Sequence, residues 1–106
     1  MKMEKAITYQ YDIVLNAPIG EKKGVIKADV FDEKIEGEIM IMRHSNYFSG
    51  TISKDGCCEI YGSIKTLLGS ISYSGCGTFS YDEIKLRLNT ENTVMTVCGK
   101  RSLKEE

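Results

Sequence analysis

Apolar and polar residues alternate along most of the chain with a period of two, which is typical of half-buried β-strands. No segment carries the apolar stripe with a period of 3.6 residues that an amphipathic helix needs. Asp55-Gly56 is the strongest hairpin signal, because this dipeptide favours a tight turn between alternating segments. The pattern predicts eight strands, over residues 7–15, 22–31, 35–42, 47–53, 57–66, 71–79, 84–88 and 93–100.

A short motif of apolar, polar, Gly, polar and apolar residues recurs three times, centred on Gly37, Gly50 and Gly62 at spacings of 13 and 12 residues. Gly75 continues the spacing. The repeat predicts that these glycines face inward, where they permit sharp strand curvature, and that each pairs with the next one across adjacent strands. This register also predicts four cross-strand pairs: Ile39 with Phe48, Ile52 with Ile60, Ile64 with Tyr73, and Met40 with Tyr47.

Eight antiparallel strands with one apolar face need a cover for that face, and the pattern offers no helix to provide it. The sheet must therefore close on itself. We predict an all-β fold consisting of a single antiparallel up-and-down meander barrel of about eight strands. The predicted domain spans residues 1–106, with residues 1–5 and 102–106 as flexible tails.

The charge balance excludes several classes of partner. Lys and Arg number 14 and Asp and Glu 15, for a net charge of -1, and no basic stripe points to nucleic acid. No apolar run approaches the roughly 18 residues that span a bilayer, so we expect no membrane partner. The residues after Met1 lack the apolar core of a signal peptide, which predicts a cytoplasmic protein.

The cysteines Cys57, Cys58, Cys76 and Cys98 are predicted to be reduced thiols. Cys57 and Cys58 point to opposite faces of a strand and no C-x-x-C motif is present, so a metal site is not predicted. The alternatives are thiols packed as small apolar groups, or a redox-sensing vicinal pair. No cofactor and no metal are expected.

The reversals at residues 16–20, 43–46, 67–69 and 89–92 are predicted to meet at one barrel end. There, an apolar lip lies beside Arg43 and His44, a combination that suits an apolar acid. The lip consists of Pro18, Ile19, Leu67 and Leu68. The inward aromatic side chains either line a cavity beneath this end or fill the barrel. The predicted ligand-binding residues are Tyr9, Tyr11, Arg43, His44, Phe48, Tyr73 and Phe79.

An apolar patch on the outer face is the predicted interface, because such patches often mark subunit contacts. It predicts homo-oligomerisation or a partner protein. The interface residues are Met40, Met42, Tyr47, Tyr61, Leu67 and Leu68.

Four stretches of the chain carry a resemblance to a known class of barrels: residues 15–20, Ser49–Gly56, Tyr61–Gly69 and Gly99–Arg101. Together they resemble small bacterial up-and-down β-barrels of the streptavidin-like or calycin type, which include lipocalin-like proteins. The resemblance implies a barrel that binds a small molecule. Streptavidin holds biotin with several tryptophans and this chain has none, so biotin binding is not predicted.

Three functions follow from these observations. The first is a non-catalytic binding module for a small apolar or mildly acidic ligand. The second is a structural or protein-interaction module that acts through homo-oligomerisation or a partner. The third is an enzyme that uses His44 or a tyrosine as acid-base, although no catalytic residue is assigned.

Overall fold

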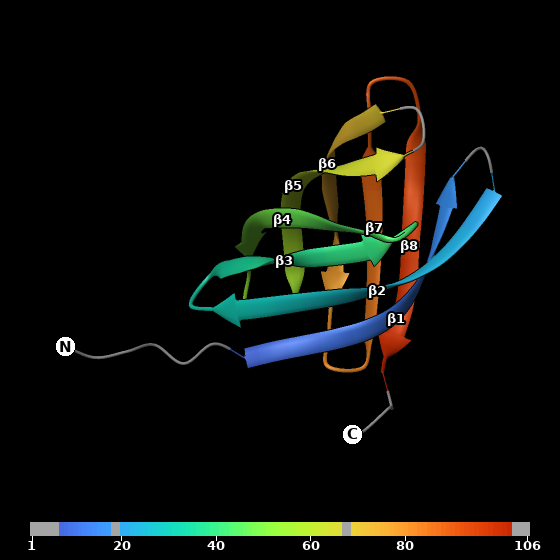
Figure 1. Cartoon of the computed structure of the whole chain (residues 1–106). Helices are drawn as coiled ribbons and strands as arrows, with labels where there is room; N and C mark the ends of the chain where they lie inside the picture. Colours follow the sequence, from blue (N-terminus) through green and yellow to red (C-terminus); the bar gives the residue numbers. More distant parts are fainter. Residues whose placement is uncertain (1–6, 18–19, 67–68, 103–106) are drawn as a thin grey trace.

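The computed structural model describes residues 7–17, 20–66 and 69–102, and this part of the chain consists of eight strands and their turns (Figure 1). The strands are β1 (Ile7–Ala17), β2 (Gly20–Phe31), β3 (Lys34–Ile41), β4 (His44–Ile52), β5 (Cys57–Thr66), β6 (Gly69–Phe79), β7 (Glu83–Asn89) and β8 (Val94–Arg101). Each pairs antiparallel with the next, and β1 also pairs with β8. The predicted closed meander barrel is confirmed. None of the described segments is a helix able to span a membrane.

Side chains that point into the barrel form one core, because buried and exposed positions alternate along the strands. Tyr11, Ile26, Leu88 and Val97 are fully enclosed. Further core positions are occupied by Ile13, Leu15, Ile35, Ile39, Phe48, Ile60, Ile64, Ile84 and Leu86. The period-two pattern therefore predicted correctly which face of the sheet is inside.

The glycines do not pair with one another, so the predicted register is wrong by two residues. Gly37 lies opposite Phe48, and Gly62 lies opposite Tyr73. The physical reason is packing, because a large side chain beside a glycine fills a narrow barrel better than two glycines together. The four expected pairs are replaced by Ile39 with Asn46, Ile52 with Cys58, Ile64 with Ile71, and Met40 with Ser45.

The β3–β4 hairpin is tighter than the sequence predicts. Residues 44–46 were expected in the reversal, but β4 begins at His44 and only Met42 and Arg43 connect the strands. Both have left-handed backbones, with φ of 53° and 67°, which is the conformation of a type I′ turn. Met42 therefore lies in a turn and packs against the core, rather than on the outer face of a strand.

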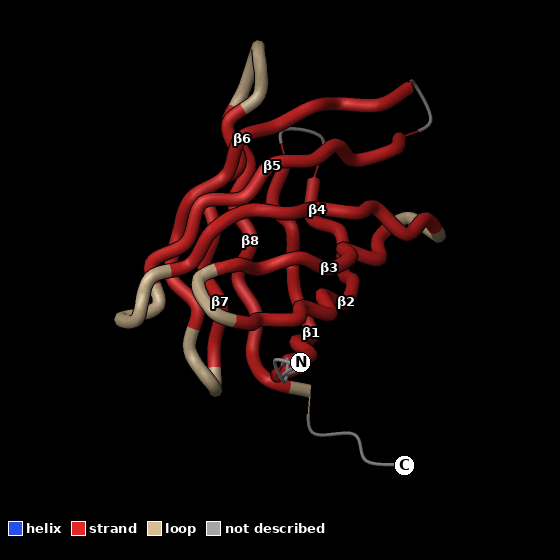
Figure 2. The backbone as a smooth tube through the Cα atoms, turned by 90° about the vertical axis from the view of Figure 1, so that its left-hand side faces the viewer, coloured by secondary structure: helices blue, strands red, loops and turns tan. Residues whose placement is uncertain are grey.

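The turns gather at two ends of the barrel. One end, here the Lys54 end, carries residues 32–33, 53–56 and 80–82, and the other, the Arg43 end, carries residues 42–43 and 90–93. Toward the Arg43 end, the β5–β6 hairpin extends beyond the strands on either side of it. β4 pairs with β5 only as far as Gly62, and β7 pairs with β6 only from Ser74. Figure 2 shows β5 and β6 running side by side and apart from β4 in this region.

Two parts of the earlier expectations fall on residues that the structure does not describe. The predicted tails lie outside the described residues except for Ser102, whose backbone N–H donates to the Gln10 carbonyl at 2.9 Å. Pro18, Leu67 and Leu68 of the predicted apolar lip and interface also lie outside them.

Candidate functional site

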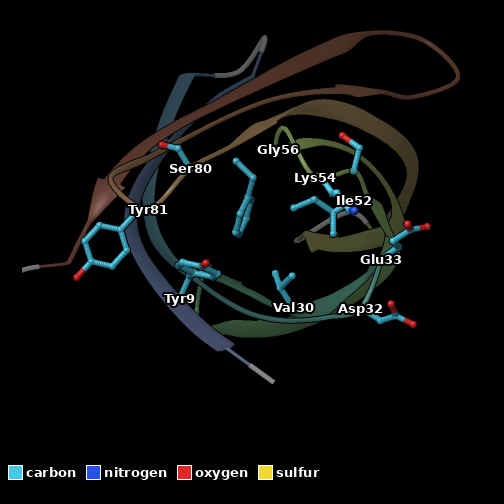
Figure 3. A pocket seen from close by; sticks show the side chains of 11 residues that line it. Tyr9, Val30, Asp32, Glu33, Ile52, Lys54, Gly56, Ser80 and Tyr81 are labelled. Carbon is cyan, nitrogen blue, oxygen red and sulfur yellow. The ribbon is translucent and has the colours of Figure 1, made fainter. Parts of the chain in front are cut away.

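A cavity of about 300 Å³ opens at the Lys54 end of the barrel (Figure 3). Its walls come from inward positions near the ends of four strands: Tyr9, Val30, Ile52 and Phe79. Turn residues Asp32, Glu33, Ser53, Lys54, Gly56, Ser80 and Tyr81 complete the lining. Apolar walls with polar groups at the opening are the usual composition of a small-molecule site.

Aromatic rings pack against each other on one side of this cavity. The ring centroids of Tyr9 and Phe79 lie 5.4 Å apart at 86°, and Tyr81 meets Tyr9 edge-on at 6.4 Å. Tyr11, one inward position deeper, contacts both Tyr9 and Phe79, at 6.3 and 5.2 Å. Edge-to-face and offset arrangements in this distance range are favourable, so the rings hold one another in place.

Contacts with Tyr11 and Arg101 hold the turn that carries Tyr81 in place. The Tyr11 hydroxyl donates a hydrogen bond to the Ser80 carbonyl. The Arg101 backbone N–H donates to the Asp82 carbonyl at 2.8 Å, and the Arg101 guanidinium lies 4.3 Å from the Tyr81 ring centroid. A cation over a ring face is attracted by the π-electrons, so Arg101 stabilises the position of Tyr81.

Burial explains the acid-base state of the tyrosine beneath the cavity. Burial raises the pKa of Tyr11, and the neighbouring Tyr9 and Asp82 raise it further. Tyr11 therefore stays neutral at physiological pH, as a hydroxyl donor to Ser80 must.

Three charged side chains stand at the rim: Asp32, Glu33 and Lys54. Within residues 7–17, 20–66 and 69–102, the one ion pair shorter than or equal to 4.0 Å joins Arg101 and Asp82, so the rim charges have no ionic partner there. The Ile52 N–H donates to the Glu33 carbonyl at 3.1 Å, which fixes the Asp32-Glu33 turn against β4. Figure 3 shows both acidic side chains on the same side of the opening.

The structure divides the seven predicted ligand-binding residues among three places. Tyr9 and Phe79 line the cavity, and Tyr11 supports it from below. Phe48 and Tyr73 lie in the core, 1% and 5% exposed. Arg43 and His44 lie at the opposite barrel end, where they line a separate surface hollow with Lys23, Met40 and Met42.

Sequence reasoning missed most of the rim. The predicted site used the reversals that meet at the Arg43 end, and no site was predicted from those at the Lys54 end. The same tracing would have brought the turns after Phe31, Ile52 and Phe79 together beside Tyr9 and Val30.

The four predicted interface residues that the structure describes line two adjoining hollows. Tyr47 and Tyr61 are 60% and 54% exposed and line a groove over β4, β5 and β6, whose lining also includes Ser70 and Ser72. Met40 and Met42 line the adjoining hollow beside Arg43, and Met40 lies opposite Ser45, which lines both hollows. The Tyr47 hydroxyl donates to Glu36 Oε1 at 2.8 Å.

All four cysteines are free thiols. Cys57, Cys76 and Cys98 are exposed, whereas Cys58 is buried on the inward face of β5. No group of three or more His, Cys, Asp or Glu side chains in the described part of the chain is placed to hold a metal ion.

The chain was compared with known family models, with curated proteins and with solved structures, and none of them matches it.

Proposed function

We propose that this barrel is a non-catalytic binding module that holds one small, largely apolar molecule in the cavity at the Lys54 end. The cavity itself carries the proposal, because aromatic and aliphatic side chains enclose a space of about 300 Å³ that the described residues do not fill. Its volume of about 300 Å³ is at the lower limit of small-molecule sites, which suits a ligand with a single ring. A barrel of eight strands is just wide enough to hold one such ligand.

The architecture supports the same reading. An eight-stranded closed meander is common to the streptavidin-like and calycin barrels that the sequence resembles, and we propose a relationship of that type. We also propose a cytoplasmic location, which the free cysteines support, since thiols persist in reducing compartments.

The rim charges refine the class of ligand. Two carboxylates, those of Asp32 and Glu33, and one ammonium group, that of Lys54, line the opening. The opening therefore favours a ligand whose polar group is neutral or cationic over one that carries an acid. The tyrosine and phenylalanine faces act in the same direction, because their π-electrons attract cations. Arg43 and His44, which would suit an acid, lie at the other end of the barrel.

Three probes of one shape test both the site and the charge preference. Benzylamine, benzyl alcohol and benzoate each contain one ring, and they differ in charge. Titrated into ¹⁵N-labelled protein, they should shift the amide resonances of Val30, Ile52 and Ser80 before those of other residues. We expect the weakest binding for benzoate.

Matched variants separate this site from general adsorption. Tyr9→Leu should weaken binding of benzyl alcohol at least fivefold, whereas Tyr47→Leu, on the outer face, should leave it unchanged. Lys54→Gln should further weaken benzoate and spare benzylamine. Shifts confined to the Arg43 end, or equal loss in both tyrosine variants, would refute the proposal.

A further inference from the structure

One edge of the sheet is left without a partner strand near the Arg43 end. β6 pairs with β5 from Gly69 to Phe79, but its pairing with β7 begins only at Ser74. The segment Gly69–Tyr73, here the β6 edge, therefore has no neighbouring strand on its β7 side among the described residues. A free edge exposes backbone N–H and C=O groups that can pair with another chain.

The β6 edge lacks the usual protection of such edges. Gly69, Ser70, Ile71 and Ser72 are exposed, and residues 69–80 contain no charged residue and no proline, although 27% of the chain is charged. Charged side chains and prolines are the common means of preventing edge-to-edge pairing.

Two other free edges near this end are protected. β2 pairs with β3 only from Gly24, and its free residues Gly20–Lys23 include Glu21, Lys22 and Lys23. β5 beyond Gly62 carries Lys65, whose backbone N–H donates to Asn46 Oδ1 at 2.9 Å.

We propose that the β6 edge pairs antiparallel with the β6 edge of a second copy of the chain, giving a two-fold symmetric dimer. The sequence of the edge is a palindrome at its centre, Ser70-Ile71-Ser72. A two-fold axis through Ile71 would place Ser70 opposite Ser72 of the second copy and the two isoleucines against each other. An isologous contact needs this kind of self-complementarity.

The charge pattern favours this occupant over a pairing through β2. A two-fold axis brings each central residue against its own copy, so an axis through Lys22 would oppose two lysines. At Ile71 it opposes two side chains that are 36% exposed and apolar, and their contact removes that surface from water. The edge is short, so the dimer is expected to be weak, with a dissociation constant on the order of micromolar or higher.

Sedimentation equilibrium of the full chain over a hundredfold concentration range tests the proposal. The native chain should change from monomer to dimer across this range. The double variant Ser70→Lys/Ser72→Lys should be monomeric throughout. In the proposed dimer the lysine at position 70 would lie opposite the lysine at position 72 of the second copy, and like charges repel. A mixture of this variant with Ser70→Glu/Ser72→Glu should restore the dimer, as a heterodimer of complementary charge.

A control addresses the competing surface on β4 and β5. Ser45→Lys/Ser49→Lys places the same substitution on the two exposed serines that flank Tyr47. This variant should dimerise like the native chain. A native chain that stays monomeric at every concentration would overturn the proposal. Loss of the dimer in the β4 variant, whatever the β6 variant does, would also overturn it in favour of the Tyr47 and Tyr61 groove, because Ser70 and Ser72 line that groove too.

Circular dichroism of each variant monitors folding. The substituted serines are exposed, so the spectra should match that of the native chain. If the β6 lysine variant does not fold, the charge-complementary mixture cannot be formed, and Ser72→Asp alone serves as the second test. It should weaken self-association at least tenfold.

Discussion

Tyr73 lies directly opposite Gly62 in the β5–β6 ladder, and a Cβ atom on Gly62 would come within 2.9 Å of the Tyr73 hydroxyl oxygen. The ring therefore occupies space that exists because residue 62 has no side chain. The Tyr73 hydroxyl is buried and has no hydrogen-bond partner among the described residues. Tyr11, also buried, differs in that its hydroxyl donates to the Ser80 carbonyl.

Removing each of these two hydroxyls should change stability in opposite directions. Tyr73→Phe removes an unsatisfied polar group and should raise the free energy of unfolding by up to about 1 kcal/mol. Tyr11→Phe removes a made hydrogen bond and leaves the Ser80 carbonyl without it, so it should lower that free energy by about 1 kcal/mol. Urea unfolding of both variants checks the signs. Equal destabilisation would contradict the contrast.

Alkaline pH should destabilise the protein before it disrupts any surface charge pair. Burial raises the pKa of Tyr73 from 10.0 to about 12, and burial together with the neighbouring thiols raises the pKa of Cys58 from 9.0 to about 11. The folded state then keeps protons that the unfolded chain has lost. The free energy of unfolding should therefore fall as pH rises from 9 to 12.

The slope of this fall should be at most about 1.4 kcal/mol per pH unit for each group. Tyr73→Phe should abolish the loss of stability that Tyr73 causes between pH 10 and 12. Cys58→Ala should abolish the loss that Cys58 causes between pH 9 and 11. Tyr11, whose pKa burial also raises, contributes in both variants. Urea midpoints that do not change between pH 8 and 11 would contradict the assignment.

The alternation of apolar and polar residues was sufficient to predict the barrel, because strand facing depends on a local period of two. Register depends on something less local, namely which large side chain fills the space beside each glycine. Gly37 and Phe48 could not be matched from spacing alone, since a shift of two residues keeps every side chain on its face.

The candidate site was predicted in part for a related reason. Tyr9 and Phe79 were recognised as inward aromatic residues, but whether inward positions leave a cavity depends on packing at each barrel end. Neither the pattern nor the charges indicate that the Lys54 end is open. Arg43 and His44 attracted attention through their chemistry, whereas Val30 and Ile52 form cavity walls with no chemical signal in the sequence.

Adding a methyl group at Gly50 should be far more costly than removing the hydroxyl of the adjacent outward residue, Ser49. A Cβ atom there would lie 1.8 Å from the Glu59 carbonyl oxygen and 2.8 Å from the Ile60 Cα, both in the β5 backbone. Gly50→Ala must therefore displace a strand, and we expect a loss of about 3 kcal/mol or more. Ser49→Ala, exposed on the same strand, should change stability by less than about 0.5 kcal/mol. Urea unfolding of the two variants measures the difference, and similar losses would refute this account of Gly50.

Thiol labelling should show three cysteines that react rapidly and one that reacts slowly. Cys57, Cys76 and Cys98 are exposed, whereas the Cys58 side chain is buried and its raised pKa keeps it protonated. An aromatic disulfide reagent at pH 8 should titrate three thiols rapidly and the fourth only in urea. Cys58→Ala should lose the slow phase alone. Four equal rates would show that the inward face of β5 is accessible.

Asn46 should prove to be the side chain that closes the barrel where the β4–β5 ladder ends. It is 7% exposed; its Nδ2 donates to the Ile39 carbonyl at 3.0 Å, and its Oδ1 accepts from the Lys65 N–H at 2.9 Å. Asn46→Leu keeps the volume but leaves both backbone groups unsatisfied, so we expect a loss of about 2 to 3 kcal/mol. Hydrogen exchange at the Lys65 amide should accelerate more than exchange at Ile60, where the ladder is intact. An acceleration spread evenly over β5 would instead mean that Asn46 contributes to global stability and not specifically to the end of the β4–β5 ladder.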